Sequence, residues 1–284
     1  MGILAATDFS TRSNRALRQA GLLAKAGGTQ LDIVHVVDDD QPAQMIETER
    51  READRVLAEQ MKVMPELSDV RCEAMVVVGD PFDGILRTAA AAKADLIVMG
   101  QHRRQLLRDI FVGTTIERVI RARSFPVLMV NNEAQQHYER ILIAVDMSEP
   151  SANAILVAKQ ARLVSESRPT LLHAFQPLAK GKILAAGSAQ AAIDEYVASE
   201  RQRTRTEVAA FLAAHGFDRE QWPLRVEEGA AGEVLSRSVR EMRADLLVMG
   251  TRGRSGLLKV LIGSVTEEAL RSLDVDILAV PPAS

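Results

Sequence analysis

Short apolar runs alternate with longer amphipathic stretches along the whole chain. Most of the runs are almost continuously apolar, which is typical of parallel strands that helices cover on both faces. Between them, apolar residues recur at helical spacing, as Leu17, Ala20 and Leu23 do. In the first half of the chain this pattern predicts strands at 3–7, 31–37, 70–78, 96–99 and 127–130, and helices at 13–26, 43–64, 81–93 and 115–123.

The second half of the chain repeats the first. The segment ADLIVMG at 94–100 returns as ADLLVMG at 244–250, 150 residues later. Asp8 returns as Asp146 at a spacing of only 138, so the second copy carries an insertion of 12 residues, which lies between His173 and Gly229. The second copy predicts strands at 141–145, 170–175, 224–227, 246–249 and 277–280.

Strands and helices that alternate in this way imply right-handed βαβ crossovers. We therefore predict two tandem, doubly wound α/β domains, each a five-stranded parallel sheet flanked by helices. The domains are expected at 1–132 and 138–284. The polar linker between them is short, so we expect the two domains to pack against each other.

Composition narrows the classes of function. Lys and Arg number 35 against 38 Asp and Glu, so the net charge is -3 and the basic excess of a duplex-binding protein is missing. The single cysteine, Cys72, excludes an internal disulfide and fits a reducing compartment. No uncharged apolar stretch approaches the roughly 18 residues that a membrane span needs. We expect a cytoplasmic protein with neither a nucleic-acid nor a membrane partner.

A glycine-containing loop follows the fourth strand of each copy, at the sheet edge where open parallel sheets bind ligands. In the second copy it reads G-x2-G-x9-G-S, through Gly250, Gly253, Gly263 and Ser264, with Arg252 among its basic residues. Glycines let an anion approach backbone N–H groups, and a helix that begins near Ser264 adds free N–H groups and partial positive charge. The pattern indicates a phosphate site, although the glycines alone are as well explained as turn and cap residues.

The Asp-x-Ser after the first strand (Asp8 and Asp146), the ADLxVMG strand and this loop together resemble the universal stress protein family, over nearly the whole chain. The resemblance implies the adenine-nucleotide-α-hydrolase-like fold, which is Rossmann-like. It also implies a pseudo-dimer of the two copies within the chain, or a homodimer. Family members with the full glycine pattern bind ATP, with or without Mg2+. Carried over to the second copy, the contacts are Asp146 and Ala174 for adenosine, and Gly250, Gly253, Gly263, Ser264 and Val265 for the phosphates, with Arg252 beside them.

The first copy departs from the family pattern. Arg103 stands where the second copy has Gly253. If that position needs a positive φ or close approach of a phosphate, arginine costs about 1 kcal/mol or more and intrudes. Alternatively, Arg103 and Arg104 hold the phosphates by their side chains. The candidate contacts here are Asp8, Val36, Gly100, Gly113 and Thr114. We expect ATP mainly in the second domain.

These features predict a nucleotide-dependent regulator of the stress response rather than an enzyme. No water-positioning residue can be named, so an efficient ATPase is not expected, while slow hydrolysis or autophosphorylation stays open. One alternative is a nucleotide-free interaction protein that works through its dimer surface. Another is a nucleotide α-hydrolase or adenylating ligase, although neither Asp-x-Ser provides the SGGxDS-like loop of those enzymes. His35 and His173 are expected to be structural, and no metal-ligand spacing occurs.

Overall fold

The computed structural model describes residues 1–101, 114–134, 137–164, 167–217, 222–253 and 262–283. Gly113, Arg103 and Arg104 lie outside these ranges. In the first half, the strands are β1 (Ile3–Ala6), β2 (Leu31–Val37), β3 (Cys72–Val78), β4 (Leu96–Gly100) and β5 (Val127–Val130). The helices are α1 (Thr11–Gly27), α2 (Ala43–Val63), α3 (Pro81–Ala91) and α4 (Thr115–Ala122), with a 3-10 turn, η1 (Pro65–Leu67), after α2.

The second half repeats this order with one additional helix. Its strands are β6 (Ile141–Ala144), β7 (Thr170–Phe175), β8 (Leu224–Glu228), β9 (Leu246–Gly250) and β10 (Asp276–Val280). Its helices are α5 (Glu149–Gln160), α6 (Lys180–Ala185), α7 (Gln190–Ala214), α8 (Ala231–Met242) and α9 (Ser264–Ser272). The predicted elements are confirmed, with ends that differ by no more than two residues.

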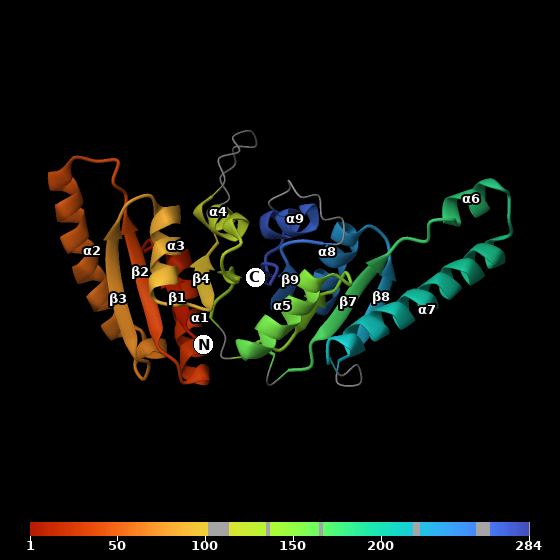
Figure 1. Cartoon of the computed structure of the whole chain (residues 1–284), viewed down its shortest axis with the longest axis horizontal. Helices are drawn as coiled ribbons and strands as arrows, with labels where there is room; N and C mark the ends of the chain where they lie inside the picture. Colours follow the sequence, from red (N-terminus) through yellow and green to blue (C-terminus); the bar gives the residue numbers. More distant parts are fainter. Residues whose placement is uncertain (102–113, 135–136, 165–166, 218–221, 254–261, 284) are drawn as a thin grey trace.

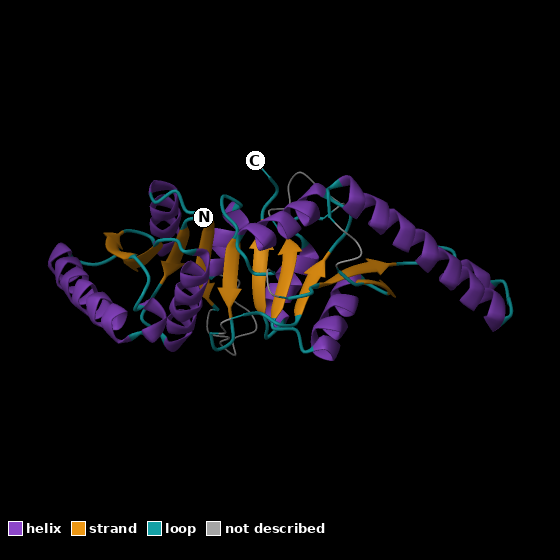
Figure 2. Cartoon of the chain, turned by 90° about the horizontal axis from the view of Figure 1, so that it is seen from below, coloured by secondary structure: helices purple, strands orange, loops and turns teal. Residues whose placement is uncertain are grey.

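The strands are parallel within each half, in the orders β3-β2-β1-β4-β5 and β8-β7-β6-β9-β10. Helices cover both faces of the sheet (Figures 1 and 2). One apolar cluster joins the sheet to α1, α2, α5 and α7, and a second cluster joins it to α3, α4, α8 and α9. Strand order switches direction beside β1 and beside β6, which opens a crevice for a ligand at each of these points.

The sequence predicts one five-stranded sheet in each of two domains that pack together, and the structure adds that the two sheets are continuous. β5 and β10 pair in antiparallel fashion, with Leu128 opposite Leu278, and the halves form one ten-stranded sheet. Each strand would otherwise be an edge with unpaired N–H and C=O groups. The pairing satisfies those groups and joins the two domains through their backbones.

The linker between the domains is fastened to β10. The backbone N–H groups of Asn131 and Asn132 donate to Asp276 Oδ1 at 2.8 and 3.0 Å, and the Tyr138 hydroxyl donates to Oδ2 at 2.8 Å. Asp276 is buried, and this burial raises the pKa of its carboxyl group. The matching position of the first copy is Pro126, which offers no such acceptor. The anchor of the linker therefore comes from the second copy alone.

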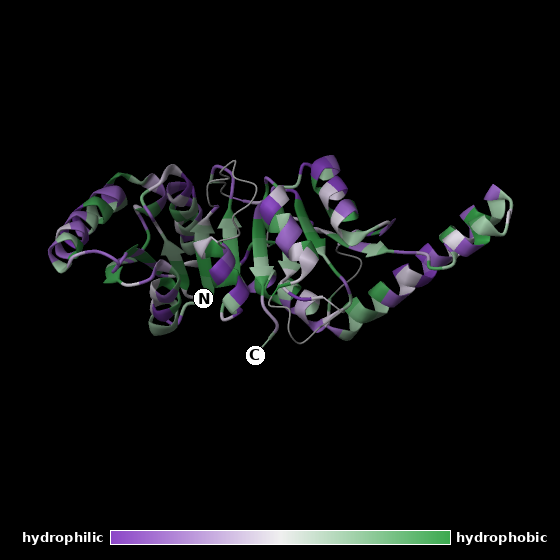
Figure 3. Ribbon diagram, turned by 90° about the horizontal axis from the view of Figure 1, so that it is seen from above, coloured by the Kyte–Doolittle hydropathy of each residue, from purple (hydrophilic) through white to green (hydrophobic). Residues whose placement is uncertain are grey.

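The insertion of the second copy forms an arm, residues 177–193, which contains α6 and the beginning of α7 (Figure 1). α7 has 25 residues against 21 in α2. Seen from above, α6 and the first turns of α7 extend away from the rest of the chain (Figure 3). Among the described residues, no helix has the length and apolar character needed to cross a membrane.

Candidate functional site

The loop after the first strand has the same backbone in both domains. Phe9 and Met147 have φ values of 61° and 60°, in the left-handed region that costs a residue with a side chain about 1 kcal/mol. Ser148 caps α5, and its backbone N–H donates to Asp146 Oδ1 at 3.1 Å. The strained turn and the cap together fix the direction of the aspartate carboxylate.

In the first domain, Ser10 caps α1, and its N–H donates to Asp8 Oδ1 at 3.0 Å. Partial burial raises the pKa of Asp8, but hydrogen bonds from Ser10 and Ser13 outweigh that effect and hold the pKa below its ordinary value. Both domains therefore present an aspartate at the end of the first strand.

The two repeated histidines hold this same loop in place. His173 Nδ1 lies 2.7 Å from the carbonyl oxygen of Val145, and His35 Nδ1 lies 2.8 Å from that of Thr7. Because a carbonyl can only accept, the proton is on Nδ1 in both rings. This contact agrees with the structural role that the sequence predicts for both residues.

The end of β7 supplies a free stretch of backbone. Val145 N–H donates to the carbonyl oxygen of Leu172 at 2.9 Å, and the paired part of β6 ends there. Since backbone groups alternate sides along a strand, those of Ala174 face the same side, beyond the end of β6. A planar ring placed there meets a backbone donor and acceptor together.

The first glycine of each loop has a packing role that the sequence reading missed. A Cβ atom at Gly250 would lie 3.0 Å from the backbone carbon and oxygen of Pro150, and one at Gly100 would lie 2.6 Å from those of Arg12. The first turns of α5 and α1 thus pack directly on these glycines. This need is the same in both domains and requires no ligand.

The surroundings of Gly253 decide one of the two alternatives that the sequence left open. Its φ is not in the left-handed region, so a positive φ is not what this position needs. Instead, a Cβ atom here would lie 2.7 Å from Asp146 Oδ2. The loop therefore packs against the aspartate carboxylate, and any side chain would have to displace one or the other.

The helix that follows the loop begins without a capping side chain. The N-cap of α9 is Gly263, whose own N–H donates to the carbonyl oxygen of Thr251 at 2.9 Å. Thr266 Oγ1 donates to the carbonyl oxygen of Gly250 at 3.0 Å, so the two ends of the loop are held together. The first N–H groups of α9, from Ser264 onward, are left for an anion.

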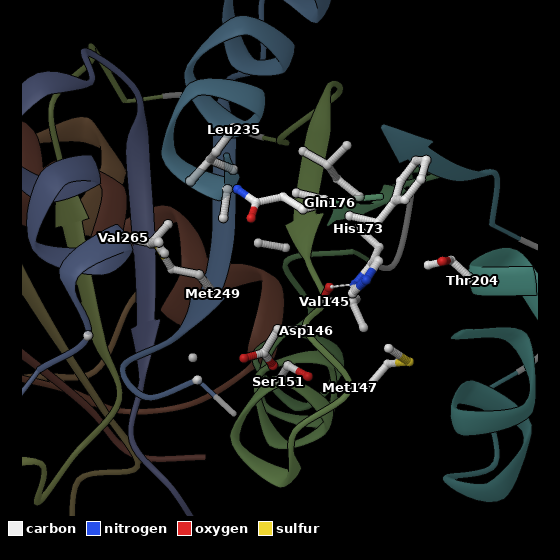
Figure 4. A pocket seen from close by; sticks show the side chains of 18 of the residues that line it. Val145, Asp146, Met147, Ser151, His173, Gln176, Thr204, Leu235, Met249 and Val265 are labelled. Atoms are coloured by element: carbon white, nitrogen blue, oxygen red, sulfur yellow. Dashed lines mark hydrogen bonds between the residues drawn. The ribbon is translucent and has the colours of Figure 1, made fainter. Parts of the chain in front are cut away.

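These features surround a single cavity of about 570 Å³ in the second domain. Figure 4 shows Asp146 between an apolar wall, formed by Leu235, Met249 and Val265, and the side of Met147 and Thr204. All the residues predicted for the second copy line it: Asp146, Ala174, Gly250, Arg252, Gly253, Gly263, Ser264 and Val265.

The sequence reading missed the contributions of α7 and α8 to this cavity, among them Arg203, Thr204 and Leu235. Helical periodicity could show that these helices are amphipathic. It could not show which residue of a helix lies over the end of a strand. Among the described residues, no group of three or more His, Cys, Asp or Glu side chains could hold a metal ion.

The first domain does not gather its candidates in this way. Asp8 lines a cavity of about 790 Å³ that lies between Phe9, His35 and α2. Of the other candidates that the structure describes, Val36, Gly100 and Thr114 do not line that cavity. The described residues of the first domain thus do not bring Asp8 together with Val36, Gly100 and Thr114 in this cavity, and ATP mainly in the second domain stays a prediction.

Two exchanges of side-chain volume accompany this difference. In the first copy Val36 packs against Gly84, and a Cβ atom at Gly84 would lie 2.8 Å from Val36 Cγ1. In the second copy the matching residues are the small Ala174 and, on α8, the larger Val234. In the first copy the larger side chain is thus at the end of the strand, and in the second copy it is on the helix.

The helix ends differ as well. In the first domain Thr114 caps α4, and Asp80 caps α3 and pairs with Arg118 at 3.0 Å. The guanidinium of Arg118 also lies 4.4 Å from the centre of the Phe82 ring. In the second domain neither α8 nor α9 has a side-chain cap, and Glu268 takes the place of Arg118. The first domain thus satisfies the N-termini of α3 and α4 with its own side chains, whereas the matching helices α8 and α9 have no such cap.

The comparisons with known proteins agree with this description. The sequence model of the universal stress protein family matches residues 1–131 and 137–281. Universal stress protein E of Salmonella typhi is 25% identical over 207 residues, which is 71% of this chain and 65% of that protein, so less than two thirds of its length is covered. Universal stress protein MJ0577 of Methanocaldococcus jannaschii is 27% identical over 46% of this chain and 94% of its own.

Two solved structures share the whole fold. A universal stress protein of Archaeoglobus fulgidus superposes with a TM-score of 0.68 at 19% identity, over 99% of this chain and 98% of its own. A Pseudomonas aeruginosa structure, described as a putative universal stress protein, gives 0.69 at 22% identity, over 99% and 93%. At this level of identity the likeness extends to the fold alone.

Proposed function

Because the chain belongs to the universal stress protein family, we propose that it is an ATP-binding regulator of the stress response that binds the nucleotide in its second domain. The observation that carries this proposal is the single cavity around Asp146, where the strand end, the glycine loop and the uncapped α9 meet. The first domain takes up little or no ATP.

The residues of the cavity suit the parts of the nucleotide. The backbone of Ala174 offers a donor and an acceptor to an adenine edge, and Leu235 and Met249 give the ring an apolar wall. Asp146 accepts a hydrogen bond from a hydroxyl or amino group of the adenosine. The phosphates lie along the loop from Gly250 to Gly253 and at the first turn of α9, where N–H groups and the helix dipole favour negative charge.

Two further observations support an anionic ligand. Thr251 Oγ1 and Arg252 Nε are buried without a hydrogen-bond partner among the described residues. Buried polar groups in native proteins usually have partners, and Arg252 lines the cavity with Thr251 next to it in the chain, which supports a polar ligand or water at this place. Arg252 also supplies a full positive charge for a phosphate.

A role as a regulator follows from the elements that the nucleotide would touch. The cavity is lined by α7 and α8 as well as by the glycine loop and α9. A ligand that contacts all of these elements stabilises the arrangement that fits it best, and so changes the population of conformers that a partner meets. ATP acts here as a ligand, and its hydrolysis is not required.

The test is calorimetric titration of the full chain with ATP and Mg2+, after bound nucleotide has been stripped and assayed. One ATP per chain is expected. Two per chain would show that the first domain also binds and that its departures from the pattern are tolerated. No binding would leave the nucleotide-free interaction protein as the better reading of the same fold.

A further inference from the structure

The arm, residues 177–193, is a folded element whose outer surface is uncovered. Ile193 is buried, α6 packs on α7, and the Tyr196 hydroxyl accepts a hydrogen bond from the N–H of Ala179 at 3.1 Å, so the shape of the arm is fixed. Yet Leu184 is 62% exposed and Leu178 is 89% exposed. No residue of α6 is buried. Large apolar side chains held in this way indicate a contact surface.

The charged side chains of the arm are all positive. The arm contains two lysines, Lys180 and Lys182, and no acidic residue. Lys180 pairs with Glu228 at 2.6 Å, whereas Lys182 is exposed at the outer end. A partner surface should therefore be acidic at its rim and apolar within.

The opposite end of the molecule has this character. The cavity of about 790 Å³ beside α2, which we call the acidic groove, is lined by the apolar groups of Phe9, Met45 and Val56 and by the carboxylates of Glu49 and Glu52. Met45 is 57% exposed. The segment 38–49, which supplies half of the lining residues, contains five acidic residues and no basic one, and Arg50 and Arg51 after it pair with Glu47.

We propose that the arm of one chain docks in the acidic groove of a second copy of the same chain. The two surfaces are complementary in charge and both expose apolar side chains. The sheet edges at β5 and β10 are already paired with each other, so these strands cannot join two chains.

The arrangement of the molecule gives this dimer its form. α2 and α6 lie at opposite ends of the long axis (Figure 1). Two chains that lie side by side in opposite directions place each arm at the groove of the other, which closes the assembly with two-fold symmetry. Lys182, Leu184 and Glu49, which the tests below alter, do not line the cavity around Asp146, so these tests are independent of the proposed function.

The first experiment is sedimentation velocity of the full chain over a range of concentrations. The unaltered chain is expected to form a dimer. Lys182→Glu, Leu184→Glu and Glu49→Lys should each raise its dissociation constant about tenfold or more, as alteration of a buried anchor does. The double variant Lys182→Glu with Glu49→Lys should restore dimers, because the pair of charges is exchanged. Leu156→Glu, at an exposed leucine on α5 outside both surfaces, is the control and should change nothing.

A disulfide test fixes the geometry. In a Cys72→Ser background, Ala186→Cys on the arm and Gln44→Cys at the groove should give covalent pairs of chains on oxidation, and no larger species. A chain that stays monomeric at all concentrations would overturn the proposal. So would a dimer that the arm and groove variants leave unchanged, or a ladder of larger cross-linked species. ATP titration of each variant, expected to match that of the unaltered chain, shows that the fold is intact.

Discussion

The two domains share a backbone but differ in how their helix N-termini are satisfied. Both have the left-handed residue after the first strand, the histidine that holds it and the glycine on which the first helix packs. In the first domain Asp80 caps α3 and Thr114 caps α4. In the second domain the matching helices have no side-chain cap. The two domains thus differ in whether these helix N-termini are satisfied by side chains, and in the second domain residues of both helices line the cavity around Asp146.

The largest expected effect comes from making the second loop like the first. Gly253→Arg should lower ATP affinity about 100-fold or more, since the new Cβ would lie 2.7 Å from Asp146 Oδ2 and the side chain would fill the cavity. Calorimetry measures the affinity, and circular dichroism checks the fold. Gly181→Arg, at an exposed glycine with open space around it, is the control. Undiminished binding to the Gly253 variant would show that the phosphate site has been misplaced.

The repeated aspartates provide a matched pair of variants. Asp146→Asn should weaken ATP binding about tenfold, because it removes a charged acceptor from the cavity, whereas Asp8→Asn should leave ATP binding unchanged. The measurement is the titration of both variants under the same conditions. Equal losses in the two variants would mean that both domains take part in binding.

A cap added to α9 tests the comparison directly. Gly263→Asp places a carboxylate at the N-cap, where it should satisfy the helix as Thr114 does in the first domain and repel phosphate. ATP affinity should fall about tenfold, while stability stays within about 0.5 kcal/mol of the unaltered chain. Gly263→Asn provides the same cap without charge and should weaken binding less. If Asp and Asn behave alike, charge at this helix end is not what matters.

Removal of a cap from the first domain should cost stability and leave ATP binding unchanged. Asp80→Ala loses the hydrogen bonds to the N–H groups of Phe82 and Asp83 and the ion pair with Arg118, at about 1 kcal/mol. Chemical denaturation measures the loss. Asp83→Ala, an exposed acid in the same turn, should cost less. A loss of ATP affinity in the Asp80 variant would contradict the division of roles between the domains.

The smallest effect is a pH dependence confined to the second domain. His215 Nδ1 lies 2.8 Å from the Phe211 carbonyl oxygen and Nε2 lies 3.2 Å from Glu149, and these contacts raise the pKa of the imidazole above its ordinary value. The imidazolium therefore stabilises the fold fully below the unfolded pKa near 6.5, and this contribution is lost as pH rises through the folded pKa. At this largely open site it amounts to about 0.5 kcal/mol or less. His215→Gln should make the free energy of unfolding, measured by denaturation at several pH values, depend less on pH. If the variant depends on pH as the unaltered chain does, other groups cause the dependence.

Much of the candidate site could be read from the chain because its members follow strands of a repeated unit. Asp146, Ala174 and Gly250 each lie at or just after the end of a strand, and parallel strands that switch order bring those ends together. The reasons for the glycines could not be read in this way. Gly253 meets a carboxylate 107 positions earlier in the chain, and Gly250 meets the first turn of α5 100 positions earlier. Such contacts depend on distances between elements, which periodicity does not contain.

By itself, the sequence determined the duplication, the order and extent of the strands and helices, and residues that gather around the cavity of the second domain. These depend on local patterns of apolar residues and on backbone preferences of glycine and serine. Only the tertiary structure decided that β5 and β10 join two sheets into one, that Asp276 fastens the linker, and that Val36 fills the space that Ala174 leaves open. Edge pairing and side-chain volume act between residues far apart in the chain, and their outcome is set only when the domains pack.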